Sequence, residues 1–149
     1  NEVFEIASKL MLSGAELTSI SDNIYGSIPM NAIKLQSEVL NRIELHEEEE
    51  LVVSYVLQED YLNYNIESSE TDFLIDSIRL VKESSVALLL KEQQDKSFKG
   101  SLRSRNELDV QQIASLFGGG GHKAASGFST NLSIEEIKNK VKNAIKSQV

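Results

Sequence analysis

Two short apolar runs limit the fold of this chain more than any other feature. Leu51–Leu57 (LVVSYVL) and Ser85–Lys91 (SVALLLK) are rich in branched aliphatic side chains and are too short for a core helix. Runs of this kind, bounded by polar residues, are typical of buried β-strands. Ser97–Arg105 follows the second run after the polar turn Glu92–Lys96, so we expect it to pair with that strand as a hairpin.

Helical patterns surround these strands. Apolar stripes over Phe4–Met11 and Leu17–Ile24, each followed by a glycine, and a third stripe from Pro29 to about Leu45 predict a helical N-terminal part. Asp60–Asn65 is expected as a turn. Further helices are expected from Thr71 or Asp72 to about Lys82, after Asp109 as a cap, and after the capping box of Ser133 and Glu136.

The fold class that these patterns predict is α+β, with a helical connector before a compact domain whose small sheet is covered by helices. We expect the connector over residues 1–48 and the compact domain over residues 49–149. The acidic run His46–Glu50 is expected as a solvated turn at this boundary. The lysines near the C-terminus are expected on a solvated helix face, with polyanion binding as the alternative.

Charge is unevenly distributed along the chain. The 149 residues carry a formal net charge of −8, which argues against a surface that coats nucleic acid. Residues 1–50 hold three basic and ten acidic side chains, a balance of −7, whereas Lys96–Lys123 holds five basic and two acidic ones, a balance of +3. The positive stretch favours an anion site, although such windows also arise by chance. With no cysteine, disulfides and thiolate metal sites are excluded, and no apolar run has the length of a membrane span.

Gly118–Gly121, followed by His122, is the first segment that indicates chemistry. Four consecutive glycines cost conformational entropy, so a fold keeps them where the chain needs positive φ or a close backbone approach. Such a loop directs several N–H groups to one point and binds an anion, with His122 as a donor at the rim. A flexible turn that ends a helix is the alternative. The specific apolar and cationic residues of Lys123–Phe128 favour phosphate or nucleotide binding.

The second such segment is the expected strand around Arg103. Side chains alternate along a strand, so Lys99, Ser101, Arg103 and Arg105 are expected on one face. Two guanidinium groups and a hydroxyl match the donors that a phosphate prefers. A polar face paired with neighbouring carboxylates explains the strand equally well when it is taken alone. Because only a short helix separates it from the glycines, we expect both segments to converge on one positive pocket.

The residues that would carry out hydrolysis are missing from this chain. Metal sites for phosphoester hydrolysis need clustered Asp and His, but the two histidines, His46 and His122, are 76 positions apart and neither lies in an Asp-rich motif. The glycines are followed by His and not by Lys-Ser, so the P-loop pattern does not fit. We therefore assign no catalytic residue and no metal ligand to this chain.

The segment GGGGHKAASGF (Gly118–Phe128) resembles a known family motif. Together with Ser101–Ser104 (SLRS) and the helix that begins at Asp109, it is similar to the C-terminal DHHA1 domain of the DHH phosphoesterase superfamily. Phe4–Leu45 is similar to the end of the catalytic DHH domain and its connector in soluble bacterial members. These are the NrnA-type bifunctional oligoribonuclease and 3′,5′-bisphosphonucleotide (pAp) phosphatases, also described as exopolyphosphatase-related. The resemblance covers essentially the whole chain.

The resemblance implies a DHHA1-like fold, a small mixed β-sheet flanked by helices, and a division of labour. An N-terminal domain outside this chain would hold two manganese ions with Asp and His ligands, and the DHHA1 domain would bind the substrate. By position in the motif, Arg103 and Ser104 would hold a phosphate, and Arg105 is a looser match. Gly119, Gly120 and Gly121 would present backbone N–H groups, and His122 would contact the phosphate near the reacting end.

The expected parent is a cytoplasmic, metal-dependent hydrolase that acts on short single-stranded RNA, pAp or a dinucleotide, without a membrane partner and with a homodimer as one candidate assembly. This chain alone is expected to bind nucleotide phosphate and to hydrolyse nothing. Three alternatives remain open. The substrate could be a linear or cyclic dinucleotide or polyphosphate, the chain could be a non-catalytic nucleic-acid-binding module, or the glycines could serve structure alone.

Overall fold

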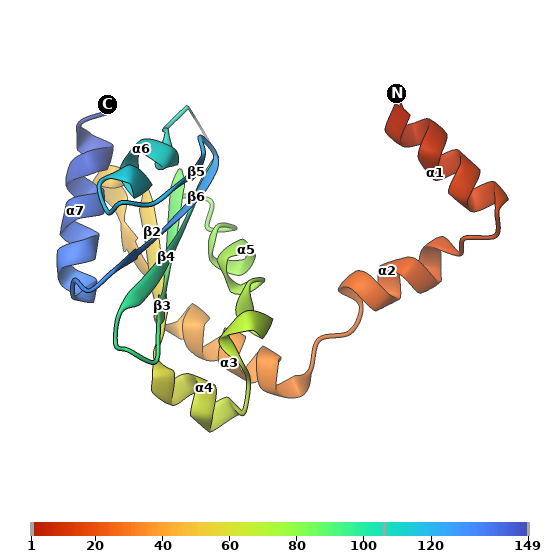
Figure 1. Ribbon diagram of the computed structural model, residues 1–149, viewed down its shortest axis with the longest axis horizontal. Helices are drawn as coiled ribbons and strands as arrows, with labels where there is room; N and C mark the ends of the chain where they lie inside the picture. Colours follow the sequence, from red (N-terminus) through yellow and green to blue (C-terminus); the bar gives the residue numbers. More distant parts are fainter. Residues whose placement is uncertain (1, 106, 149) are drawn as a thin grey trace.

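The computed structural model describes residues 2–105 and 107–148. In this part of the chain, three helices lead into a six-stranded sheet that carries further helices on both faces (Figure 1). In chain order the elements are α1 (Glu2–Leu12), α2 (Leu17–Tyr25), α3 (Met30–Asn41), β1 (Glu44–His46), the 3-10 helix η1 (Glu47–Glu49), β2 (Leu51–Val56), α4 (Gln58–Tyr64), the 3-10 helix η2 (Ser68–Thr71), α5 (Leu74–Ile78), β3 (Val86–Glu92), β4 (Phe98–Ser104), α6 (Val110–Ser115), β5 (Gly120–His122), β6 (Ala125–Thr130) and α7 (Ile134–Lys146).

The sheet is mixed, with the strand order β1-β2-β3-β4-β6-β5. β2 and β3 are parallel, and every other neighbouring pair is antiparallel. A parallel pair needs a long crossover, and here α4, η2 and α5 supply it. The two apolar runs form β2 and β3, which are buried almost throughout, and β4 pairs with β3 as the expected hairpin. The predicted small mixed sheet flanked by helices is confirmed.

Alternate side chains of the strands enter two separate cores. On one face, residues such as Leu88 and Leu102 pack with α6 and α7. On the other face, residues such as Val52 and Leu89 pack with α3 and α5. Figure 1 shows these helix pairs on opposite sides of the sheet. The alternation predicted for β4 is confirmed, because Phe98, Gly100 and Leu102 are buried while the residues between them are exposed or half-buried.

Two predicted helix starts are confirmed by their caps. The Asp109 carboxylate accepts hydrogen bonds from the backbone N–H groups of Gln111, at 2.9 Å, and Gln112. Ser133 and Glu136 form the expected capping box, in which the Glu136 carboxylate accepts from the Ser133 N–H at 2.8 Å and the Ser133 hydroxyl accepts from the Glu136 N–H. These caps fix where α6 and α7 begin, and α6 leads directly into the glycine segment.

Other local predictions were wrong. Asp60–Tyr64 belongs to α4 rather than a turn, and Asn65 follows that helix. The helix expected from Thr71 or Asp72 to Lys82 is shortened to α5, with η2 before it. The third N-terminal helix ends at Asn41, and Glu44–His46 forms β1 instead. The Asp60 carboxylate is held by Arg42, 18 residues earlier in the chain, and β1 pairs with β2, which follows it after the η1 turn.

The acidic run forms the turn between β1 and β2, as expected, and its glutamates are exposed apart from one. Glu49 is buried, and its carboxylate forms ion pairs with Lys146 at 2.8 Å and with Lys142. The lysines of α7 are only partly solvated: Lys138 is buried between Glu44 and Glu135 and Lys140 donates to the Leu116 carbonyl, whereas Lys146 is exposed. Ion pairs with the acidic run thus offset the charges of Lys142 and Lys146 within the domain, which reduces the positive charge that α7 presents to a polyanion.

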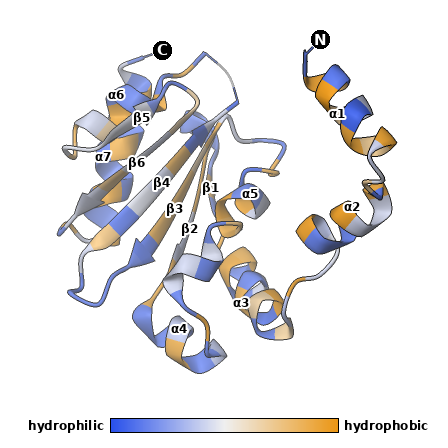
Figure 2. Ribbon diagram, turned by 45° about the vertical axis from the view of Figure 1, so that its right-hand side comes forward, coloured by the Kyte–Doolittle hydropathy of each residue, from blue (hydrophilic) through white to orange (hydrophobic). Residues whose placement is uncertain are grey.

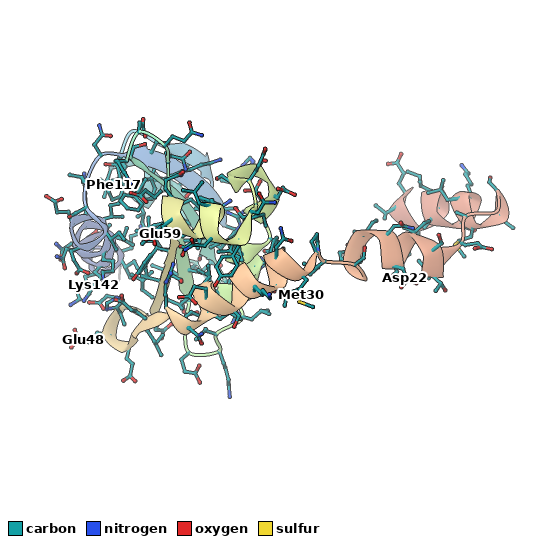
Figure 3. All side chains as sticks on the ribbon, turned by 90° about the horizontal axis from the view of Figure 1, so that it is seen from below. Asp22, Met30, Glu48, Glu59, Phe117 and Lys142 are labelled. Carbon is teal, nitrogen blue, oxygen red and sulfur yellow. The ribbon has the colours of Figure 1, made fainter. Side chains whose placement is uncertain are left out.

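The helical N-terminal part divides into two regions. α1 and α2 have no buried residue and extend away from the sheet (Figures 1 and 3), and Figure 2 shows apolar residues along both helices. α3 instead places Ala32, Leu35 and Val39 in the core beside the sheet. By packing, α3 and β1 belong with the compact domain. The predicted boundary between the connector and the compact domain, between residues 48 and 49, stays a prediction.

Candidate substrate-binding face

Strand register places most of the predicted site residues on one surface. β4, β6 and β5 extend beyond the strands that α3 and α5 cover, and paired residues on antiparallel strands point to the same side. We call this surface the open face. Its residues are Lys99, Ser101 and Arg103 of β4, Ala125, Gly127 and Ser129 of β6, and Gly120 and His122 of β5. Each is exposed or half-buried, whereas the alternate residues Phe98, Leu102, Ser126 and Phe128 are buried on the opposite side.

Arg103 lies on β4 in the open face, half-buried and opposite Ala125 of β6. Its Nη1 donates to the neighbouring Leu102 carbonyl at 3.0 Å, which fixes the direction of the guanidinium. Among the residues that the structure describes, no carboxylate forms an ion pair with Arg103 or with Lys99. Since an arginine fork binds a phosphate through two parallel hydrogen bonds, Arg103 retains this capacity.

The glycines have structural reasons that differ along the segment. Gly118 and Gly121 adopt φ values of +75° and +144°, which L side chains rarely adopt. A Cβ on Gly119 would meet the Gly127 carbonyl oxygen at 2.2 Å and the Phe128 side chain at 2.6 Å. The segment therefore lies directly against β6. This close approach was the reason expected from the sequence.

The segment does not form a loop with converging N–H groups along its whole length. Gly120–His122 is the strand β5, paired with β6 on one side and lying at the edge of the described sheet on the other. Alternate residues of an edge strand direct their N–H groups away from the partner strand. The edge thus offers at most two backbone N–H groups in a short row and not at one point, and the predicted donor N–H of Gly119 is already bonded to the Ala114 carbonyl at 3.0 Å. His122 is exposed at the end of this row, on the same face as Arg103.

Phe128 and its neighbours support this edge on the face of the sheet that α6 and α7 cover. The Phe128 ring fills the space where a Cβ of Gly100 would lie and stacks on Phe117, with ring centroids 4.2 Å apart. The Lys140 ammonium lies 4.6 Å from the Phe117 ring centroid and also donates to the Leu116 carbonyl at the end of α6. Packing on the α7 side of the sheet thus holds the glycine strand in position.

Arg105 and Ser104 are placed differently from Arg103. The Arg105 guanidinium donates to the backbone carbonyls of Arg79 and Val81, which follow α5, so it holds that turn against the sheet. The Ser104 N–H donates to the Ala124 carbonyl at 2.9 Å. A phosphate at Arg105 would have to compete with its two carbonyl partners. The predicted phosphate contacts of both residues stay predictions.

Sequence reasoning missed Lys91 of β3. Lys91 pairs with Lys99 in the β3–β4 register and therefore faces the same side of the sheet. Its ammonium is buried and forms an ion pair with Asp72 at 2.7 Å. The available signal was the lysine itself, which ends the apolar run expected as a buried strand and, if buried there, needs a partner.

Outside the open face, the described residues offer little that would bind a phosphate or a metal ion. A hollow of about 1050 Å³ lies between α4 and the β3–β4 turn, but its lining includes Glu67, Glu70 and Asp95 and no basic side chain, so it would repel a phosphate. Residues 2–105 and 107–148 hold no group of three or more His, Cys, Asp or Glu residues that could bind a metal ion. None of the helices in this part has the length and apolar character that a membrane crossing requires.

Comparisons with known proteins agree with this architecture. The bifunctional oligoribonuclease and PAP phosphatase NrnA of Thermus thermophilus is 30% identical over 149 residues, which cover 99% of this chain and 44% of that protein. The chain thus spans less than half the length of this relative.

Two solved structures share the fold. An exopolyphosphatase-related protein from Bacteroides fragilis superposes with a TM-score of 0.88 at 21% identity, over 99% of this chain and 43% of the other. The pGpG-specific phosphodiesterase PggH from Vibrio cholerae superposes with a TM-score of 0.52 at 12% identity, over 80% of this chain and 40% of the other. A model of the DHHA1 domain family matches residues 48–147, so the chain belongs to this family.

Proposed function

We propose that this chain is the substrate-binding part of a phosphoesterase that hydrolyses short oligoribonucleotides, pAp or both. The observation that carries the proposal is the open face, where Arg103 and His122 lie beside an edge strand of glycines. The relative from Thermus thermophilus, an oligoribonuclease and PAP phosphatase, supports this choice of substrates. The enzyme is then a hydrolase of the DHH type, and its substrates are nucleotides.

The open face suits one end of a nucleotide. The Arg103 fork offers two donors to a phosphate, and His122 and the outward N–H groups of β5 offer more. Between them, Ala125 and Gly127 have small side chains or none, so a ribose or base can approach the sheet backbone closely. Held in this way, the substrate's phosphate would be positioned and part of its charge offset before hydrolysis.

In this proposal the chemistry belongs to a domain outside the chain, where manganese would activate the attacking water. The described residues do not suit that role, since they contain no cluster of potential metal ligands. We therefore assign the chain only the binding and orientation of substrate, and we expect it to hydrolyse neither pAp nor RNA by itself. Manganese, a cytoplasmic location and a homodimer remain expectations of the family resemblance.

Titration calorimetry of the 149-residue chain with pAp and with a triribonucleotide tests the proposal. We expect binding of both, and a loss of about tenfold or more in Arg103→Ala, the size expected when a charged hydrogen-bonding partner is removed. Lys34→Ala is the matched control, because Lys34 is an exposed cation on α3, away from the open face.

Equal affinities for the wild type and Arg103→Ala would contradict the proposal, as would an equal loss in Lys34→Ala. Adding pGpG and a transfer RNA to the panel separates the alternatives. Preference for pGpG would indicate a dinucleotide phosphodiesterase. Tight and strongly salt-dependent binding of the transfer RNA would indicate a non-catalytic nucleic-acid-binding module.

A further inference from the structure

A pair of lysines extends the positive charge of the open face beyond Arg103. Lys99 lies four residues before Arg103 on β4, on the same face, which separates the two Cα atoms by about 13 Å along the strand. Lys91 is the direct cross-strand partner of Lys99. Like charges opposite each other destabilise a sheet, so this pair needs an anion.

Asp72 supplies this anion from the segment between η2 and α5. Its carboxylate lies 2.7 Å from the Lys91 ammonium, whose side chain is only 4% exposed. The Asp72 side chain itself is 83% exposed, so this carboxylate also faces solvent. The hydrogen bond from Lys91 lowers the pKa of Asp72, and the charges of Lys91, Lys99 and Arg103 lower it further. Asp72 therefore stays ionised at neutral pH, beside a row of three cations.

This arrangement divides the positive row into two halves. At the Arg103 end, no carboxylate among the described residues forms an ion pair, so a phosphate finds an unsatisfied guanidinium. At the Lys91–Lys99 end, the Asp72 carboxylate pairs with Lys91 and lies close enough to Lys99 to interact with its charge, so its negative charge would oppose a second phosphate. A second phosphate would have to displace Asp72 or lie beside it, and both carry an electrostatic cost.

We propose that Asp72 is a specificity-determining residue that excludes a second phosphate from the Lys91–Lys99 end of the open face and so confines the ligand to the Arg103–His122 end. The inference rests on the proposed function, since it presumes that a nucleotide phosphate binds at Arg103. Its consequence is that the wild-type chain gains little affinity as an oligoribonucleotide becomes longer.

The test compares Asp72→Asn with the wild type, using pAp and a pentaribonucleotide as ligands. Asparagine keeps an oxygen that can accept from Lys91 but removes the charge. We expect the Kd of the pentaribonucleotide to fall about fivefold, the effect of one ion pair of about 1 kcal/mol, while the Kd of pAp stays within about twofold. Asp76→Asn is the matched control, because Asp76 lies on α5, pairs with Arg79 and loses the same charge; it should change neither Kd.

A second variant keeps the proposal testable if Asp72→Asn weakens folding. In the background of Lys99→Gln, Asp72→Asn should no longer lower the Kd of the pentaribonucleotide, because the exposed cation at that end of the face has been removed. The role of Asp72 would be overturned by equal changes in Kd for both ligands or by no change in either Kd. An equal gain in pentaribonucleotide affinity in Asp76→Asn would also overturn it. If the wild type bound neither ligand, the proposed function itself would fail, and this result is distinct from all of those.

Discussion

At the scale of single residues, Gly119 and Gly120 are neighbours that the fold needs for different reasons. A Cβ on Gly119 would enter the backbone of β6, whereas a Cβ on Gly120 would meet no protein atom within 4 Å. Register places that empty space above Gly120 on the open face, beside Gly127 and Ser101. No internal contact therefore requires glycine at position 120, and in our account the ligand does.

We predict opposite results for alanine at these two positions. Gly119→Ala should lower the free energy of unfolding by about 3 kcal/mol, because β5 and β6 must move apart. Gly120→Ala should leave it unchanged or raise it by about 0.5 kcal/mol, because alanine loses less conformational entropy, yet it should weaken pAp binding several-fold. Urea unfolding and calorimetry measure the two effects. Full pAp affinity in a stably folded Gly120→Ala would contradict the placement of the ligand.

Arg105 gives a second prediction at this scale. Because its guanidinium donates to the Arg79 and Val81 carbonyls, Arg105→Ala should lower the free energy of unfolding by about 1 kcal/mol and leave most of the pAp affinity. Arg103→Ala should leave the free energy of unfolding nearly unchanged and weaken pAp binding. The two variants are compared by urea unfolding and by pAp titration. A loss of affinity in Arg105→Ala as large as in Arg103→Ala, with normal stability, would restore Arg105 to the phosphate site.

At the scale of secondary-structure elements, α3 and α4 are joined by one strong ion pair. Arg42 follows α3 and donates from Nη1 and Nη2 to the two carboxylate oxygens of Asp60, at 2.5 and 2.9 Å. The same carboxylate accepts from the Leu57 N–H at the start of α4. Burial alone would raise the pKa of Asp60, but the hydrogen bonds from Arg42 and Leu57 outweigh it and lower the pKa below its usual range.

The sign of this shift predicts how stability depends on pH. A carboxyl whose pKa is lowered by folding contributes stability above its unfolded pKa and loses it as the pH falls through the folded value. Asp60→Asn should therefore cost about 2 kcal/mol near pH 7, and the gap from the wild type should close as the pH falls below about 4. Urea unfolding across this range tests it, and a gap that widens in acid would contradict the sign.

Elements with local causes were predictable from the sequence, and elements with distant causes were not. β2, β3 and the starts of α6 and α7 follow from apolar runs and capping side chains within a few residues. In α4 the ion-pair partner of Asp60 is Arg42, 18 residues away, and β1 has only 3 residues, too few for an alternating pattern to be recognised. The open face was partly predictable because alternation along β4 is local. The partners of Arg105 and Lys91 come from α5 and its flanking turns, which no local pattern reveals.

At the scale of the whole molecule, the net charge of −8 is unevenly distributed over the two sides of the sheet. The glutamates before β2 pair with the lysines of α7 on one side of the sheet; Figure 3 labels Glu48 of η1 and Lys142 of α7, the two elements that carry these groups. The open face lies on the other side and keeps Lys99 and Arg103, which form no ion pair with a described carboxylate. A small positive surface on an acidic protein attracts a short anion and repels a long polyanion. This distribution fits a short nucleotide better than a duplex.

The most direct test of the account maps where a nucleotide touches the chain. Amide chemical shifts of the labelled 149-residue protein would be recorded during titration with pAp. We predict that the shifts concentrate on Ser101, Arg103, Gly120, His122 and Ala125, while the amides of α7 stay unchanged. Shifts centred on α7 or on the hollow beside α4, with the open face unaffected, would contradict the assignment of substrate binding to β4, β5 and β6.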